Sequence, residues 1–180
     1  MDYRGCGGDP ARGVRGDGMT MSARSGIRKR TTKSAAQTVR EGVKLAEALR
    51  PGDIVLLSGD LGAGKTHFTK GILKGLGAAE DAVSPTFTIV NEHRTGRMPL
   101  IHIDVYRLGD IDELYEIGFD EYLTGEAVTV IEWADKFPEL AELPGRVFRV
   151  DIRRRDDVDP DRREIRTYLP GPDNGEDNKC

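Results

Sequence analysis

The sequence is poor in cysteine and contains no long apolar run, and each shortage excludes a class of protein. Its two cysteines, Cys6 and Cys180, stand near opposite ends of the 180-residue chain, so neither a cysteine metal cluster nor a disulfide framework is expected. No apolar run approaches the ~18 residues that a membrane-spanning helix needs. The first residues also lack the apolar stretch of a signal peptide. We therefore expect a cytoplasmic protein with no membrane partner.

The balance of apolar and charged residues is typical of a soluble globular protein. Hydrophobic residues make up 37% of the chain and charged residues 32%, with a formal net charge of -4. A net negative charge gives no general reason to expect direct binding to nucleic acid. The length suits one domain with a core of its own.

The chain divides into a body and two tails. Residues 1–32 are rich in Gly and Arg without apolar periodicity, and residues 170–180 contain prolines and acidic residues. Such segments bury too little apolar surface to fold. We predict a disordered tail over 1–32, one domain over 33–169 and a second disordered tail over 170–180. For the basic segment 24–30, contact with RNA and a solvated tail both remain open, and the second is favoured.

Apolar patterning in the body predicts alternating strands and helices. A turn signal at Thr95-Gly96 predicts an antiparallel hairpin between the segments on either side, and Ser34 is a candidate helix N-cap. Strands are expected at 54–57, 86–93, 100–106, 127–131, 147–152 and 165–169, with helices after Ser34, from Lys65 to Leu76 and over 111–122. This order predicts an α/β fold with a mostly parallel sheet, helices on both faces and one antiparallel hairpin.

The strongest motif runs from Gly59 to Thr66 and matches G-x-x-x-x-G-K-[ST] throughout. Glycines let such a loop turn tightly and bring backbone N–H groups against phosphate oxygens. Lys65 is expected to reach the β- and γ-phosphates of ATP, and the Thr66 hydroxyl is expected to ligate Mg²⁺. The phosphate-binding residues are predicted to be Gly59, Asp60, Leu61, Gly62, Ala63, Gly64, Lys65 and Thr66. With a strand before it and a helix behind it, the loop predicts the three-layer sandwich of P-loop NTPases.

A P-loop needs a second acidic residue near the metal, usually at the end of a buried strand. Glu132 ends the apolar segment 128–131, and Asp104 ends the segment 100–103. For either carboxylate, a solvated residue at a strand end is the alternative, and cooperation of the two, one on Mg²⁺ and one on a water, is also open. We predict that Lys65, Asp104 and Glu132 are the catalytic residues.

The motifs also occur in a specific order. After the P-loop come Ser84-Pro85-Thr86-Phe87, then 102–108 with the sequence HIDVYRL, then Ile131-Glu132-Trp133. This succession resembles the TsaE (formerly YjeE) family, the ATPase component of the bacterial machinery that makes threonylcarbamoyladenosine in tRNA. The resemblance covers roughly residues 34–168 and is more specific than the P-loop alone.

The resemblance implies roles for residues that the P-loop motif does not cover. It implies that Thr66 and Glu132 hold Mg²⁺ and that Asp104 orients the attacking water. Further nucleotide contacts are implied for Ala35 and Thr38 near the adenine, Ser84 and Thr86 in a switch-like loop, and Arg162 in a late segment. One departure stands at His67, where the family commonly has Thr or Ser.

The same resemblance implies partners, and slow turnover is expected because the sequence shows no full set of catalytic base and arginine finger. The implied partners are the threonylcarbamoyl-transferring subunit and its inactive paralogue, with tRNA reached only through their complex. Arg107 fits either an arginine finger or an ordinary ion pair, and the second is favoured. We therefore expect slow ATP hydrolysis by the chain alone and stimulation by partners.

Two other functions remain as alternatives. A regulatory GTPase is disfavoured because the body lacks the guanine-reading motif N-K-x-D. A stand-alone small-molecule kinase needs an acceptor pocket and a lid that bears arginine, and the Arg-rich stretch 153–155 with Arg162 and Arg163 leaves that alternative open. The resemblance favours the ATPase.

Overall fold

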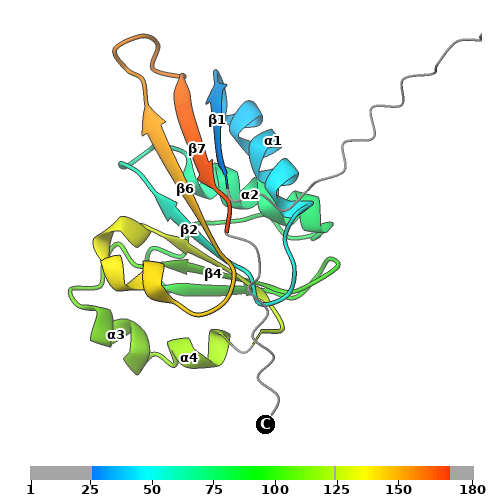
Figure 1. Cartoon of the computed structure of the whole chain (residues 1–180), viewed down its shortest axis with the longest axis vertical. Coiled ribbons are helices and arrows are strands. Elements are labelled where there is room, and N and C mark those ends of the chain that lie inside the picture. The colour runs from blue at the N-terminus through cyan, green and yellow to red at the C-terminus, as the bar shows by residue number, and fades with distance from the viewer. Residues whose placement is uncertain (1–25, 124, 171–180) are drawn as a thin grey trace, which may run out of the picture.

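The computed structural model describes residues 26–123 and 125–170, and within these ranges seven strands form one sheet in the order β1-β7-β6-β2-β5-β4-β3 (Figure 1). The strands are β1 Ile27–Thr32, β2 Ile54–Ser58, β3 Val90–His93, β4 Leu100–Asp104, β5 Val128–Glu132, β6 Val147–Arg154 and β7 Arg163–Tyr168. The helices are α1 Ala35–Ala46, α2 Lys65–Leu76, α3 Ile111–Glu116 and α4 Phe119–Tyr122, followed by the short 3-10 helices η1 Ala134–Lys136 and η2 Pro138–Glu142.

The centre of the sheet is parallel and both of its edges are antiparallel. Strands β6, β2, β5 and β4 run parallel to one another. Strand β3 pairs antiparallel with β4 at one edge, and β7 and β1 continue the sheet antiparallel at the other. The predicted α/β fold and the predicted hairpin are therefore confirmed. The sequence did not predict the second antiparallel edge.

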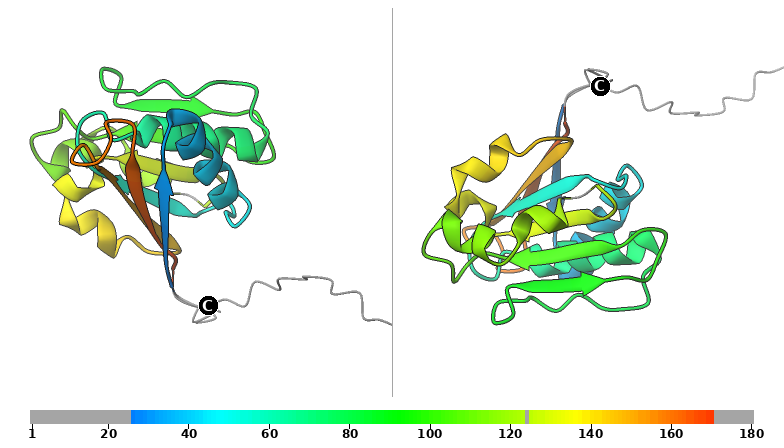
Figure 2. Two further views of the ribbon diagram at one scale, coloured as in Figure 1. Left: turned by 90° about the horizontal axis from the view of Figure 1, so that it is seen from above. Right: turned by 90° about the horizontal axis from the view of Figure 1, so that it is seen from below.

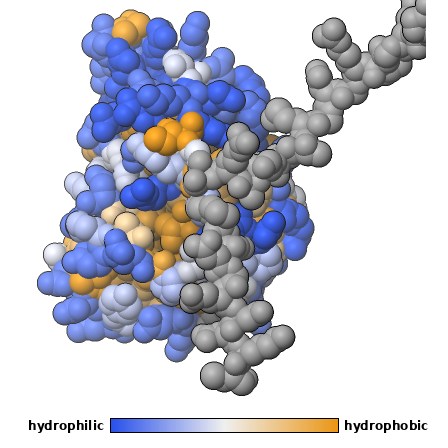
Figure 3. Space-filling model, in the orientation of Figure 1, coloured by the Kyte–Doolittle hydropathy of each residue, from blue (hydrophilic) through white to orange (hydrophobic). Residues whose placement is uncertain are grey.

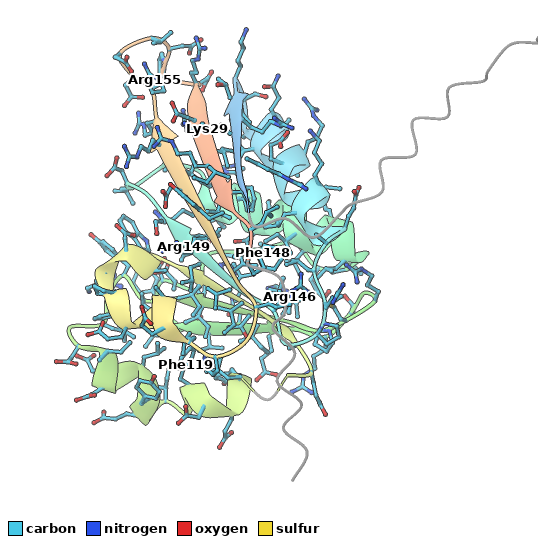
Figure 4. The ribbon with its side chains drawn as sticks, viewed as in Figure 1. Lys29, Phe119, Arg146, Phe148, Arg149 and Arg155 are labelled. Atoms are coloured by element: carbon cyan, nitrogen blue, oxygen red, sulfur yellow. The ribbon has the colours of Figure 1, made fainter. Side chains whose placement is uncertain are left out.

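The strand β2 separates two hydrophobic cores because its side chains alternate between the faces of the sheet. Val55 and Leu57 face a core shared with α1 and α2, whereas Ile54 and Leu56 face a core shared with α3 and α4. The two further views in Figure 2 show helices on both sides of the sheet. Phe148 belongs to the first core and Phe119 to the second (Figure 4). The predicted three-layer arrangement is confirmed.

Two glycines allow α1 and α2 to pack in direct backbone contact. A Cβ on Gly71 would lie 2.1 Å from the carbonyl oxygen of Val39, and one on Gly42 would lie 2.2 Å from that of Phe68. Helix α2 begins at Lys65, directly after the P-loop glycines. The close approach to α1 therefore fixes the helix that carries the P-loop lysine.

The part of the sheet formed by β6, β7 and β1 has one buried face and one exposed, charged face. In β6, Phe148, Val150 and Ile152 are buried, whereas Arg149 between them and Arg153 after them are exposed. Figure 3 shows hydrophilic residues over most of the upper part of the molecule, where β6, β7 and β1 lie, and Figure 4 labels Lys29 and Arg149 there.

The prediction that a tail extends to residue 32 is wrong for Ile27–Thr32, which form β1. Every residue of β1 pairs with β7, from Ile27 opposite Tyr168 to Thr32 opposite Arg163. Five of its six residues are exposed, so the strand lacks the apolar pattern from which strands are predicted. Backbone hydrogen bonds at a sheet edge order it instead. The remaining tail residues, 1–25 and 171–180, lie outside the described residues.

Three predicted elements are shorter than expected, and one of them is the strand predicted at 100–106, which ends at Asp104. The strand predicted at 86–93 is confirmed only for Val90–His93, because Ile89 takes a left-handed φ of 65° that ends the extended segment. The helix predicted over 111–122 is interrupted at Gly118, which has a φ of 82°. The predicted N-cap is confirmed, since Ser34 Oγ accepts from the backbone N–H of Gln37. Among the helices of the described residues, none is both long and apolar enough to cross a bilayer.

Candidate functional site

A cleft of about 370 Å³ lies between the P-loop and the carboxyl ends of β4 and β5. Loops converge at this edge of a parallel sheet, which is where open α/β sheets bind ligands, and the volume falls in the range of small-molecule sites. The lining comprises residues 61–67 together with Ser84, Thr86, Asp104, Tyr106, Glu132 and Trp133. Most of the predicted site residues are therefore brought together in one cleft.

The backbone of the P-loop follows the conformation that its glycines permit. Gly59, Gly62 and Gly64 have φ values of 138°, 72° and 108°, in a region that other residues rarely adopt. Gly64 caps α2 without a side-chain hydrogen bond. A phosphate bound here would fill that capping role and would also meet the positive end of the helix dipole.

Lys65 is buried at the base of the cleft, with 5% of its surface exposed. Its Nζ donates to the carbonyl oxygens of Gly59 at 2.5 Å and Asp60 at 3.0 Å. Nζ also lies 3.4 Å from the centre of the Trp133 ring. Burial lowers the pKa of Lys65 from its usual value of 10.5, and the Glu132 carboxylate opposes that shift. The ammonium group is thus held among loop carbonyls and an aromatic face in the part of the cleft predicted to receive phosphates.

Thr66 and Glu132, the two predicted metal ligands, are in direct contact. The Thr66 hydroxyl donates to Glu132 Oε2 at 3.1 Å, although the two residues lie on different elements, α2 and β5. Glu132 is 2% exposed. A hydroxyl and a carboxylate are hard oxygen donors of the kind that Mg²⁺ prefers, so this pair fits a magnesium ion that takes its remaining ligands from water and phosphate.

Asp104 lies directly beside Glu132 in the register of β4 and β5. Its Oδ2 accepts from Ser84 Oγ at 2.7 Å and from Thr86 Oγ1 at 2.9 Å. Its Oδ1 accepts from the backbone N–H of Tyr106 at 2.9 Å. The carboxylate therefore fastens the loop of Ser84 and Thr86 to the sheet at the edge of the cleft.

Trp133 reaches the cleft through an uncommon backbone conformation. Successive side chains of a strand point to opposite faces, so a residue after Glu132 would normally point away from the cleft. Trp133 instead has a left-handed φ of 65°, and both residues line the cleft. Its ring lies 4.7 Å from that of Tyr106. Trp133 and Tyr106 enter the sequence analysis only as members of motifs, and neither was proposed as a site residue; those motifs were the available signal.

Five predicted nucleotide contacts do not line the cleft: Gly59 and Asp60 at the start of the P-loop, Ala35, Thr38 and Arg162. Ala35 and Thr38 lie in the first turn of α1, where the Thr38 methyl is 3.6 Å from the Cβ position of Gly64. Arg162 is outside the lining as well. Nucleotide contacts by these residues remain predictions.

Arg163, the residue after Arg162, contacts the P-loop directly. Its Nε donates to the Ala63 carbonyl at 3.0 Å and its Nη2 to the Gly62 carbonyl at 3.4 Å. Sequence reasoning missed it by one position, because pairing along β7 decides which of two adjacent arginines faces the loop.

Comparison with known proteins identifies the family. The family model described as "Threonylcarbamoyl adenosine biosynthesis protein TsaE" matches residues 32–165. The chain belongs to the TsaE family. The match confirms the resemblance inferred from the order of the motifs, and it spans the P-loop and every residue that lines the cleft.

Individual relatives and a solved structure agree. The "tRNA threonylcarbamoyladenosine biosynthesis protein TsaE" of Bacillus subtilis is 47% identical over 116 residues, which are 64% of this chain and 69% of that protein. The protein of the same name from Treponema pallidum is 40% identical over 122 residues, covering 68% of this chain and 88% of its own length. The crystal structure of Bacillus subtilis YdiB superposes with a TM-score of 0.67 at 37% identity, covering 83% of this chain and 90% of that one.

Proposed function

We propose that this chain binds ATP with Mg²⁺ in the cleft and hydrolyses it as the ATPase component of tRNA threonylcarbamoyladenosine biosynthesis. The observation that carries the proposal is the convergence of Lys65, Thr66, Asp104 and Glu132 on one cleft in a member of the TsaE family. Relatives of this chain take their name from the same biosynthesis, which favours this function over that of a stand-alone small-molecule kinase.

The proposed mechanism is phosphoryl transfer to water. The P-loop N–H groups and the Lys65 ammonium bind the phosphates and neutralise charge that develops on them. Thr66 and Glu132 would hold the Mg²⁺, which would supply Lewis-acid stabilisation of the same charge. The protein otherwise acts mainly by positioning, since little covalent chemistry is required of it.

Asp104 is proposed to orient the attacking water. Its Oδ2 is the acceptor for both Ser84 and Thr86, so a water that reaches this oxygen competes with the loop for it. Movement of the loop and placement of the water are therefore linked through one atom. A loop that changes position with the γ-phosphate is the device by which P-loop switches signal to partners.

The partners that we propose are the threonylcarbamoyl-transferring subunit and its inactive paralogue, with tRNA bound through them in the cytoplasm. Exposed apolar residues close to the cleft support docking of a protein. Leu61 lines the cleft and is 74% exposed, and Phe87 follows the Ser84–Thr86 loop and is 84% exposed. The functional domain that we propose is residues 33–169, extended at its start by β1.

The test is binding and turnover by the full chain. Calorimetry is expected to show ATP binding that Lys65→Met abolishes and that Lys70→Met preserves. Lys70 is a matched control because it lies on the same helix, outside the cleft, and pairs with Asp81 at 3.2 Å. ATP is expected to bind more tightly than GTP. Turnover should release inorganic phosphate; equal binding by Lys65→Met, or transfer of the phosphate to a metabolite, would disprove the proposal.

A further inference from the structure

A buried histidine stands behind the proposed metal ligand. His102 of β4 is fully buried, and its Nε2 lies 2.8 Å from Glu132 Oε1. The other carboxylate oxygen, Oε2, accepts from the Thr66 hydroxyl. Glu132 and Thr66 line the cleft, whereas His102 does not. The two oxygens of Glu132 thus have separate partners, one in the protein interior and one at the cleft.

The hydrogen bond fixes where the imidazole carries its proton. An ionised carboxylate only accepts hydrogen bonds, so His102 Nε2 must be the donor to Oε1. Within the described residues, the opposite ring atom, Nδ1, is buried and has no hydrogen-bond partner. A proton on Nδ1 would have no acceptor there, and the arrangement therefore favours the tautomer with the proton on Nε2.

We propose that His102 is a positioning residue that presents Glu132 to the cation through one oxygen only, and that it thereby favours Mg²⁺ over Ca²⁺. This inference rests on the proposed function. With Oε1 held by His102, Oε2 alone remains on the cleft side, next to the Thr66 hydroxyl. Mg²⁺ requires a compact octahedron, whereas Ca²⁺ accepts about six to eight oxygens and often takes both from one carboxylate.

The proposal separates a positioning role from simple packing. If His102 only filled space, its loss would change stability and would affect binding with both cations alike. If it restrains Oε1, its loss lets the carboxylate rotate and bind through two oxygens, which weakens binding with Mg²⁺ but not with Ca²⁺. The quantity that distinguishes the two roles is the ratio of the nucleotide affinities measured with the two ions.

A neighbouring histidine provides the control. His93 of β3 is also buried, at 6% exposure, and its ring centre lies 6.4 Å from that of His102. It has no contact with Glu132 among the hydrogen bonds of the described residues. A substitution at His93 thus perturbs the same packing region without touching the proposed metal ligand.

The experiment is calorimetry of the full chain with an ATP analogue whose β–γ bridge is an NH group, in MgCl₂ and separately in CaCl₂. The variants are His102→Leu, which removes the donor, His102→Gln, whose amide nitrogen replaces Nε2, and His93→Gln. Loss of a residue that supports a metal ligand typically weakens metal binding by about 10- to 100-fold. We expect His102→Leu to lower the Mg²⁺/Ca²⁺ affinity ratio at least about tenfold, while His102→Gln and His93→Gln keep the wild-type ratio.

The outcomes separate this inference from the proposed function. Wild-type protein that binds the analogue equally with and without either metal would disprove the proposed metal site itself. If the wild type binds in a metal-dependent way, two results would overturn the role of His102 alone. One is an unchanged Mg²⁺/Ca²⁺ affinity ratio in His102→Leu. The other is a decrease of that ratio in His93→Gln as large as the decrease in His102→Leu. Thermal unfolding checks that each variant is folded. If His102→Leu does not fold, His102→Asn, whose shorter amide does not reach Oε1, replaces it in the comparison.

Discussion

Asp104 and Glu132 occupy directly paired positions at the carboxyl ends of two adjacent parallel strands, β4 and β5. The two buried carboxylates have different partners. Asp104 accepts from the loop hydroxyls of Ser84 and Thr86, and Glu132 accepts from Thr66 and His102. The same sheet edge thus presents one carboxylate bound to the P-loop threonine and one bound to the loop of Ser84 and Thr86.

Because Asp104 and Glu132 have different partners, substituting each of them is expected to reduce ATP hydrolysis in a different way. Glu132→Gln keeps the shape of the side chain but removes its charge, so Mg²⁺-dependent hydrolysis should fall at least about tenfold, or ~1.4 kcal/mol of transition-state stabilisation. The expected change includes a higher Mg²⁺ concentration for half-maximal phosphate release. Asp104→Asn should lower the rate without that change. The reverse pattern would mean that the metal-binding and water-orienting roles are exchanged.

Lys65→Met should separate binding from stability. Burial lowers the pKa of Lys65 below 10.5, so the ammonium form is less favourable in the folded protein than in the unfolded chain. Removing it should abolish ATP binding yet leave the free energy of unfolding within about 1 kcal/mol of wild type. Wild-type stability should also gain from this group as the pH rises toward 10.5, and the variant should lack that gain. Urea unfolding at neutral and alkaline pH measures both. A large loss of stability at neutral pH would contradict the assignment.

The close packing of α1 and α2 predicts a steric effect at Gly71. A Cβ there would meet the Val39 carbonyl oxygen at 2.1 Å and Gly42 Cα at 2.8 Å, both of them backbone atoms that move only with the helices. Gly71→Ala should therefore destabilise the protein by about 1–3 kcal/mol. Denaturant unfolding is the measurement, with Lys70→Ala, at a half-buried position of the same helix, as control. A stabilising effect from the gain in helix propensity would show that the helices separate easily.

The buried His93 is expected to make the folded protein less stable in acid. Burial, followed by the neighbouring His102, lowers the pKa of His93 from its usual value of 6.5. The unfolded chain then binds a proton at a higher pH than the folded one, so stability is complete above about pH 6.5 and declines as the pH falls further. His93→Gln removes this group and should reduce the loss of stability between about pH 7.5 and pH 5.5. Identical losses in wild type and variant would assign the acid sensitivity to other groups.

The sequence predicts the P-loop and its flanking elements because their signals are local. A glycine-rich motif follows an apolar strand and precedes a helix, and the structure places α2 at Lys65–Leu76 as expected. The P-loop motif alone left Asp104 and Glu132 open as the acidic partner; the family resemblance implied that Glu132 lies with Thr66, and the two are in contact. Strand β1 was missed because its order comes from pairing with β7, more than a hundred residues later along the chain.

The unpredicted parts of the site depend on register and backbone conformation. Arg163 rather than Arg162 meets the P-loop because of the pairing of β6 with β7. Trp133 enters the cleft through a left-handed φ, which no side-chain pattern reveals. His102 supports Glu132 from the adjacent strand, and a contact of this kind is visible only once the strand order is known.

The most direct test of the central claim is the threonylcarbamoyladenosine content of tRNA in cells that depend on this chain. In the native host, the gene is replaced by the wild type, Lys65→Met or Lys70→Met, and the modified nucleoside is quantified by mass spectrometry at matched protein levels. We expect wild type and Lys70→Met to maintain the modification and Lys65→Met to lose it, since Lys65 lines the proposed nucleotide cleft and Lys70 does not. Full modification in cells that carry Lys65→Met would contradict the account.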